Sequence, residues 1–183
     1  STMTIENDND LEALKKIGVI VGNTLQAMGK ALEPGMTTRE LDNIGRVLLE
    51  REGARSAPEL AYGFPGATCI SVFPDIAHGI PGDRVLAAGD LVNIDVSAEL
   101  HGYYADTGAS FVMPPKAARL ERLARDGKRA MWAGVNSVRA GAKLRDIGAA
   151  VNPARANRQI GASQHSLHQL GNIRWRHGEI AVH

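Results

Sequence analysis

The amino-acid sequence predicts a mixed α/β (α+β) fold, in which helices precede and follow a group of short strands. Apolar residues recur every three or four positions in the helical segments and every second position in the clearest strand. Prolines and glycines separate the segments. The expected helices are 8–32, 39–51, 116–138 and one from Leu144, and the expected strands are 69–73, 90–98 and 103–113.

The first two expected helices combine an apolar stripe with signals at their ends. Asp8 or Asn9 is suited to cap the first helix, and the sequence Glu-Pro-Gly at 33–35 breaks it. Thr38 is the expected cap of the second helix and Gly53 its stop. The residues expected to face the core are Leu11, Leu14, Val21, Leu25, Met28 and Leu32, then Leu41, Ile44, Leu48 and Leu49.

The strands follow a segment, 56–68, that is expected to be a loop because it holds two prolines and two glycines. In the strand at 90–98, aliphatic residues fill the even positions from Val92 to Val96 and polar residues fill the odd ones. This period of two is typical of a half-buried strand. The return strand ends before two consecutive prolines at 114–115, and a glycine at 141 separates the last two helices.

Residues 32–41 and 138–147 share a pattern: a helix end, a glycine break, then a helix that opens with arginine, an acidic residue and an aliphatic residue. Either the chain contains a duplicated α/β half or two helix junctions are similar by chance. We expect one domain over residues 1–151 and a divergent C-terminal tail over 152–183, with disorder of this tail as one alternative.

Bulk properties predict an ordinary globular protein of the cytoplasm. The formal net charge is +1, so no strong attraction to nucleic acid or to a membrane surface is expected. One cysteine excludes an intrachain disulfide. No apolar run approaches the ~18 residues of a membrane helix, and the polar, acidic start does not resemble a signal peptide.

Asp95 and Asp106 lie in two adjacent predicted strands. If the turn is centred between Leu100 and His101, the two aspartates lie opposite each other on one face. Like charges directly opposed across strands are destabilising, so a cation between them is one explanation, and hard divalent ions prefer such oxygens. The alternatives are solvated surface charges, or a register that is shifted by one residue and separates the pair.

Five short motifs occur in order: GFP at 63–65, CISV at 69–72, HGIPG at 78–82, GDLVNIDV at 89–96 and GYYADT at 102–107. With these motifs the chain resembles the methionine aminopeptidases of bacterial type I, from about Leu11 to Val151. The resemblance implies a pita-bread fold and a two-metal hydrolase that removes N-terminal methionine from peptides and nascent chains. The metals it implies are two divalent ions, among Co, Mn, Fe, Zn and Mg.

The resemblance also implies roles for individual residues. Asp95 and Asp106 become metal ligands, and His78 becomes the residue that hydrogen-bonds the substrate and assists proton transfer. Phe64 and Cys69 become walls of the methionine pocket, with Tyr62 as a further wall. Pro58, Ala61 and Phe73 depart from the family pattern near this pocket.

The C-terminal region departs further. The expected GHGIG turn and two later glutamate ligands are not found, and His165 and His168 are the nearest counterparts of a metal histidine and a catalytic, substrate-contacting histidine. We therefore expect weak metal binding and slow or no turnover. Two alternatives to an active aminopeptidase remain: a catalytically impaired pita-bread interaction module, and a related proline-directed dipeptidase. The sequence leaves the oligomeric state open.

Overall fold

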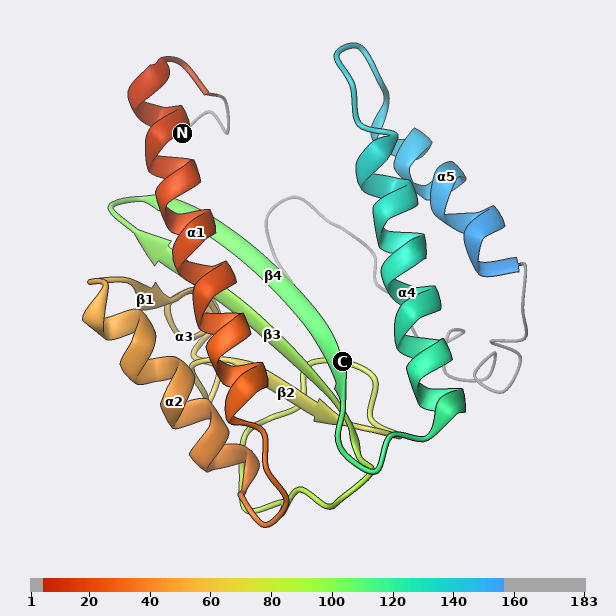
Figure 1. Ribbon diagram of the computed structural model, residues 1–183. Coiled ribbons are helices and arrows are strands. Elements are labelled where there is room, and N and C mark those ends of the chain that lie inside the picture. Colours follow the sequence, from red (N-terminus) through yellow and green to blue (C-terminus); the bar gives the residue numbers. More distant parts are fainter. Residues whose placement is uncertain (1–4, 157–183) are drawn as a thin grey trace. The chain divides into compact units, whose positions relative to one another are not determined.

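The computed structural model describes residues 5–156 and has the expected mixed α/β character (Figure 1). The chain divides into two compact units, Ser1–Glu121 and Arg122–His183. The elements are α1 (Asp8–Ala31), α2 (Thr38–Arg51), β1 (Arg55–Ser56), α3 (Ala57–Tyr62), β2 (Cys69–Val72), β3 (Leu91–Leu100), β4 (Tyr103–Val112), α4 (Ala118–Asn136) and α5 (Leu144–Ala156).

The first unit contains a four-stranded antiparallel sheet built around β3. β4 pairs with β3 along its whole length. β2 pairs with residues 92–95 of β3, and β1 pairs with residues 98–99. Because β4 occupies one edge of β3, the short strands β1 and β2 follow one another along its other edge.

One face of this sheet is packed under α1 and α2 (Figure 1). Val92, Ile94 and Val96 of β3 are fully buried there. They form one apolar cluster with α1 and α2 side chains, namely Ile17, Ile20, Val21, Leu25, Met28, Leu41 and Leu49. The core face predicted for the first helix was wrong at its start, because Leu11 remains 37% exposed.

Two contacts hold α1 against β4, one at Gly29 and one at Tyr103. A Cβ atom at Gly29 would overlap the ring of Phe111, so the helix approaches this strand closely only because residue 29 has no side chain. At the other end, the Tyr103 hydroxyl donates to Asp10 Oδ1 at 2.6 Å. The helix is therefore held against both ends of β4.

The residues that cap the two helices lie one or two positions before the predicted ones. Asn7, not Asp8 or Asn9, caps α1 by accepting from the Asp10 N–H at 3.0 Å. Thr37, not Thr38, caps α2 in a capping box, in which Glu40 Oε2 accepts from the Thr37 N–H at 2.7 Å. The Thr38 hydroxyl instead forms hydrogen bonds with the backbone of Gly82.

The predicted loop at 56–68 was wrong in its first half, where α3 forms. Ser56 caps this short helix by accepting from the Glu59 N–H, and Pro58 lies in the first turn, where its missing N–H is no loss. Gly63 ends the helix in the left-handed region, at φ 66°.

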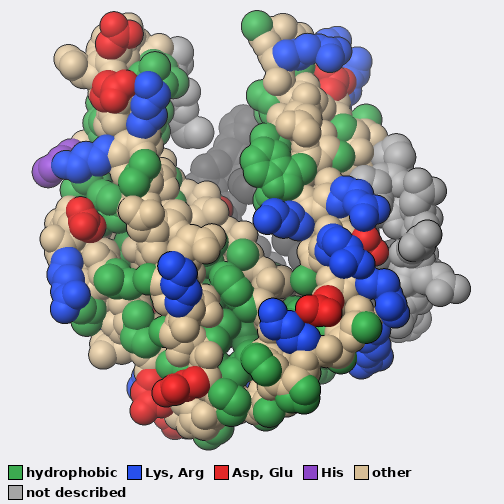
Figure 2. Space-filling model, in the orientation of Figure 1, with side chains coloured by type: hydrophobic (Ala, Val, Ile, Leu, Met, Phe, Trp, Pro, Cys, Tyr) green, Lys and Arg blue, Asp and Glu red, His purple; other side chains and the backbone are tan. Residues whose placement is uncertain are grey.

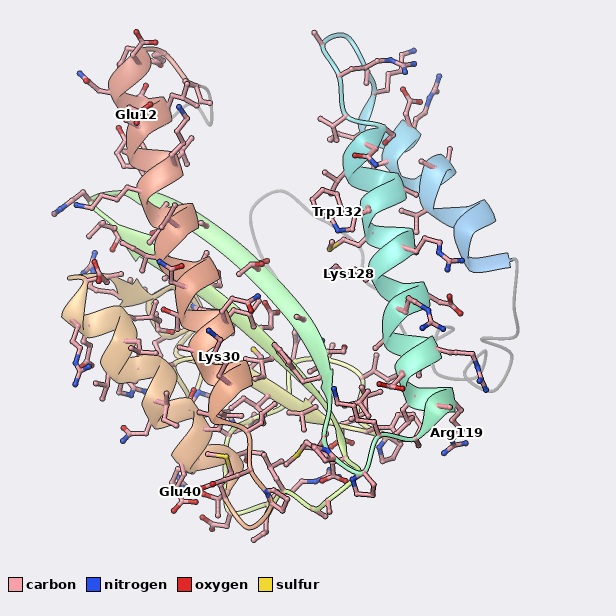
Figure 3. The ribbon with its side chains drawn as sticks, viewed as in Figure 1. Glu12, Lys30, Glu40, Arg119, Lys128 and Trp132 are labelled. Carbon is pink, nitrogen blue, oxygen red and sulfur yellow. The ribbon has the colours of Figure 1, made fainter. Side chains whose placement is uncertain are left out.

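The second unit contains most of α4, followed by α5. A Cβ atom at Gly134 would lie 3.0 Å from Val151 Cγ2 and 3.2 Å from Ile147 Cγ2, so this glycine permits close helix packing. Lys128 and Trp132 project from α4 on the side away from α5 (Figure 3). Lys and Arg side chains cover much of the visible surface of α4 (Figure 2). The domain boundary expected after Val151 falls within α5 and stays a prediction.

Candidate active site

The β3–β4 hairpin turns at His101 and Gly102, with φ values of 53° and 89°. Positive φ at both central residues is the geometry of the two-residue turns that best match strand twist. Leu100 therefore pairs with Tyr103, Asp95 with Gly108, and Ser97 with Asp106. The predicted direct opposition of Asp95 and Asp106 was wrong by two residues. Because the shift is even, both side chains still lie on one face.

Asp95 and Asp106 meet diagonally across the strand pair. A Cβ atom at Gly108, directly opposite Asp95, would lie 3.5 Å from Asp95 Oδ1, so glycine leaves room beside this carboxylate. Burial raises the pKa of Asp95, and a hydrogen bond to Asp106 and the charge of Asp106 raise it further, to about 7. Two carboxyl groups in such contact do not both ionise readily.

Cys69 and Tyr62 share this environment. Cys69 pairs with Asp95 on the other edge of β3 and is buried. Burial raises the pKa of the Cys69 thiol to about 11, and the charges of Asp95 and Asp106 add to the shift. Burial and the negative charges of the same three groups raise the pKa of Tyr62 as well. The structure thus brings together four residues that were selected from the sequence.

Phe64 lies beside Tyr62 at the end of α3. Their ring centroids are 6.1 Å apart and the ring planes meet at 70°, an edge-to-face contact. Tyr62 is 56% exposed, whereas Phe64 is half-buried. The two rings offer apolar surface next to the residues on β2 and β3.

His78 lies on an exposed loop that is fastened to β2. The Gly79 N–H donates to Ser71 Oγ at 3.0 Å, and the Gly79 carbonyl accepts from the Ile70 N–H at 2.9 Å. A Cβ atom at Gly79 would overlap the Ile70 backbone, so only glycine allows this approach. His78 itself has φ 55°. Ser71 was not selected as a site residue, although it belongs to the CISV motif.

The remaining candidate residues do not join this group in the part of the chain that the structure describes. Asn93, which lies on the same face of β3 as Asp95, donates from its amide to Ser110 Oγ at 3.1 Å across the hairpin. His165 and His168 lie outside the described residues. Gly108 was also not selected. It can be recognised as the partner of Asp95 only once the register of the hairpin is known.

The two aspartates fit the chemistry of a divalent cation, which prefers carboxylate oxygens. Within residues 5–156, however, no group of three or more His, Cys, Asp or Glu side chains is gathered to hold an ion. The described residues therefore supply two carboxylates rather than a complete ligand set. In this same part of the chain, no helix has the length and apolar character needed to cross a membrane.

Comparison with solved structures gives the class of fold. A methionine aminopeptidase from Rickettsia prowazekii superposes with a TM-score of 0.79 at 33% identity, over 84% of this chain and 62% of that one. A prolidase from Pyrococcus furiosus, 19% identical, shares the fold alone, with a TM-score of 0.70 over 82% of this chain and 43% of that one. The chain has the pita-bread fold, as the motifs predict.

Comparison with sequences gives the family. The profile of metallopeptidase family M24 matches residues 12–177, which continues beyond Val151. Methionine aminopeptidase 2 of Bacillus subtilis is 49% identical over 150 residues, which cover 81% of this chain and 60% of that protein. A methionine aminopeptidase of Staphylococcus epidermidis is 49% identical over 157 residues, 85% of this chain and 62% of that protein. The chain belongs to metallopeptidase family M24 and spans about 60% of the length of these relatives.

Proposed function

We propose that this chain takes part in the metal-dependent removal of N-terminal methionine from peptides and nascent chains in the cytoplasm. The observation that carries the proposal is the meeting of Asp95 and Asp106 on one face of the sheet, beside Tyr62 and Cys69. The 49% identity to methionine aminopeptidases over 150 residues supports methionine as the side chain that is recognised.

In this proposal Asp95 and Asp106 hold divalent ions, with His165 as a further ligand. Bound divalent ions supply Lewis acidity toward the scissile carbonyl and lower the pKa of water. His78, presented by a loop that is fixed to β2, hydrogen-bonds the substrate, and His168 assists. The pocket for the flexible, apolar methionine side chain is lined by Phe64, Cys69 and Tyr62.

The test is hydrolysis of a Met-Ala-Ser peptide with Mn²⁺ or Co²⁺ present. We expect Asp95→Ala to abolish whatever hydrolysis the unsubstituted chain shows, because half of the carboxylate pair is lost. Asp83→Ala is the matched control, since the Asp83 side chain is 92% exposed and forms a surface ion pair with Arg39. Hydrolysis that persists in Asp95→Ala contradicts the proposal.

The second candidate is a catalytically impaired pita-bread interaction module. The observation that favours it is the two-carboxylate set found among residues 5–156. Two carboxylates leave most coordination positions of a cation to water, so we expect binding to be weak. Calorimetric titration with Mn²⁺ or Co²⁺ separates the candidates. Tight binding of two ions per chain contradicts the impaired module and our expectation of weak binding.

A further inference from the structure

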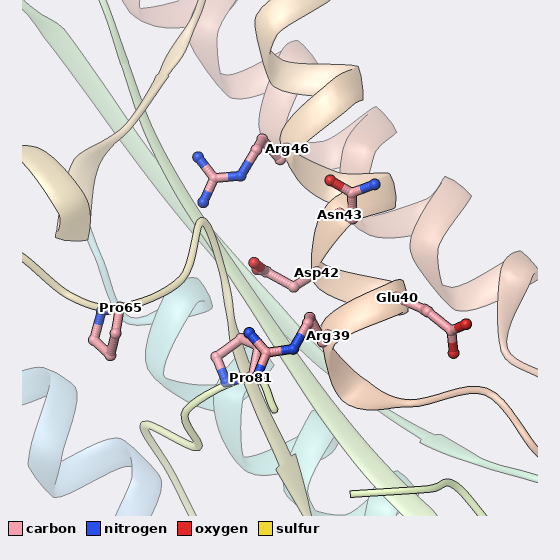
Figure 4. A pocket seen from close by; sticks show the side chains of 7 residues that line it. All are labelled: Arg39, Glu40, Asp42, Asn43, Arg46, Pro65 and Pro81. Atoms are coloured by element: carbon pink, nitrogen blue, oxygen red, sulfur yellow. The ribbon is translucent and has the colours of Figure 1, made fainter. Parts of the chain in front are cut away.

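Asp42 is a buried carboxylate that the proposed chemistry does not use. It projects from α2 toward the loops that carry Pro65 and Pro81 (Figure 4). Only 6% of the residue is exposed. A buried charge of this kind is costly unless it is well hydrogen-bonded, so its partners indicate what it does.

Among residues 5–156, the hydrogen bonds that the Asp42 carboxylate accepts come from one short segment. Oδ2 accepts from the Ala67 N–H at 3.1 Å, and Oδ1 accepts from the Thr68 N–H and the Thr68 hydroxyl, each at 2.7 Å. Ser56 adds a fourth anchor by donating to the Ala67 carbonyl at 2.9 Å. Hydrogen bonds to an ionised acceptor are among the strong ones, so residues 67–68 are held firmly to α2.

This anchor lies between candidate walls of the substrate pocket. Phe64 precedes it, and Cys69 follows directly. On the other side of Phe64, the Gly63 N–H donates to the Glu59 carbonyl at 3.1 Å. Phe64 is therefore carried by a short segment whose two ends are fixed, one by α3 and one by Asp42.

The same helix also holds the neighbouring loop. The Thr38 hydroxyl accepts from the Gly82 N–H at 2.9 Å and donates to the Gly82 carbonyl at 3.1 Å. The two loops touch, because a Cβ atom at Gly66 would lie 2.8 Å from Pro81 Cδ. A shift at residues 67–68 would therefore move both loops against each other.

We propose that Asp42 is a positioning residue for substrate selection: through residues 67–68 it sets the placement of Phe64 and Cys69 around the first side chain of the substrate. The inference rests on the proposed function and deepens it. Asp42 touches neither substrate nor metal in this scheme, and it acts through the loop that it holds.

The test compares a methionine peptide with a leucine peptide of the same length, Met-Ala-Ser and Leu-Ala-Ser. Asp42→Asn keeps the size of the side chain but places an amide NH₂ against a backbone N–H donor. We expect the ratio of kcat/KM for the two peptides to fall at least fivefold, mainly through a higher KM for the methionine peptide. This ratio does not depend on how much of the enzyme is folded, so a purely structural role leaves it unchanged.

Two further variants calibrate the effect. Thr68→Val removes one of the three hydrogen bonds to Asp42 and keeps both backbone bonds, so it should shift the ratio in the same direction but less. It also carries the test if Asp42→Asn does not fold. Asp83→Asn makes the same chemical change at an exposed position and should leave the ratio unchanged.

An unchanged ratio in both Asp42→Asn and Thr68→Val overturns the proposal. If the unsubstituted chain does not hydrolyse either peptide, the proposed function fails, and the positioning role is then measured by calorimetric binding of L-methionine and L-leucine to the full chain. A preference for methionine that weakens in Asp42→Asn supports the role. A preference that persists, or no binding of either amino acid, overturns it.

Discussion

The even and odd positions of β3 have opposite surroundings although they share one backbone. Val92, Ile94 and Val96 are fully buried under the helices. On the other face Asp95 meets a second carboxylate, at a cost shown by its raised pKa of about 7. One face thus contributes stability, whereas the carboxylate pair on the other face lowers it. The two properties should respond to different substitutions.

The largest effect is expected from the core face. Ile94→Ala should lower the free energy of unfolding by about 2–5 kcal/mol, because it removes buried methyl and methylene groups and leaves a cavity. Urea denaturation measures this change. Asn93→Ala, at the preceding residue, loses one hydrogen bond to Ser110 and should cost only about 1 kcal/mol. Equal costs at the two positions would contradict the contrast.

A smaller effect of opposite sign is expected at Asp95. Its folded-state pKa of about 7 lies above the ordinary value of 3.8, so between these pH values the folded, metal-free chain keeps a proton that the unfolded chain releases. Stability therefore falls as the pH rises through this window. Asp95→Asn should remove this loss and stabilise the metal-free chain at pH 8 by about 1–2 kcal/mol.

Chemical denaturation at pH 5 and pH 8, with EDTA present, measures the effect. Asp90→Asn is a suitable comparison, since Asp90 accepts from the Ala87 N–H in a turn outside the carboxylate pair. If Asp95→Asn destabilises the chain at pH 8, the carboxylate pair is not repulsive and the contrast between the faces is weaker than described.

The smallest effect is expected at Ser71, which lies on the polar face and holds the His78 loop. Ser71→Ala removes the acceptor of the Gly79 N–H and should cost about 1 kcal/mol. Amide hydrogen exchange at Gly79 should become faster, whereas exchange at Ile94 should not change. Faster exchange at both amides would mean that the loop and the sheet open together.

The sequence predicts much of this fold because the relevant signals are local. The alternation from Val92 to Val96 identifies β3 and its buried face, and proline and glycine mark most boundaries. α3 was missed because Pro58 suggests a loop, although in the first turn of a helix proline is tolerated. Thr37 and Thr38 are chemically alike, so only the backbone decides which one is the cap.

The sequence selected the residues that meet at the candidate site, but it did not give their pairing across the hairpin. The sequence offered Asp95 and Asp106 as a pair, but both their shared face and their register depend on the length of the turn at His101 and Gly102 and on its positive φ angles. The contacts of Asp42 with Ala67 and Thr68 join segments 25 and 26 residues apart. No local pattern specifies such contacts, since they arise from the packing of α2 against the sheet.

The two-residue turn at His101 and Gly102 also restricts how this protein can change in length. One residue inserted between the turn and Asp106 would move that carboxylate under α1, unless a bulge absorbed it. Two inserted residues would keep it on the polar face but displace it along the strand. Length variation in this part of the hairpin is therefore expected to obey a parity rule, in which even changes keep the carboxylate on its face and odd changes require a bulge.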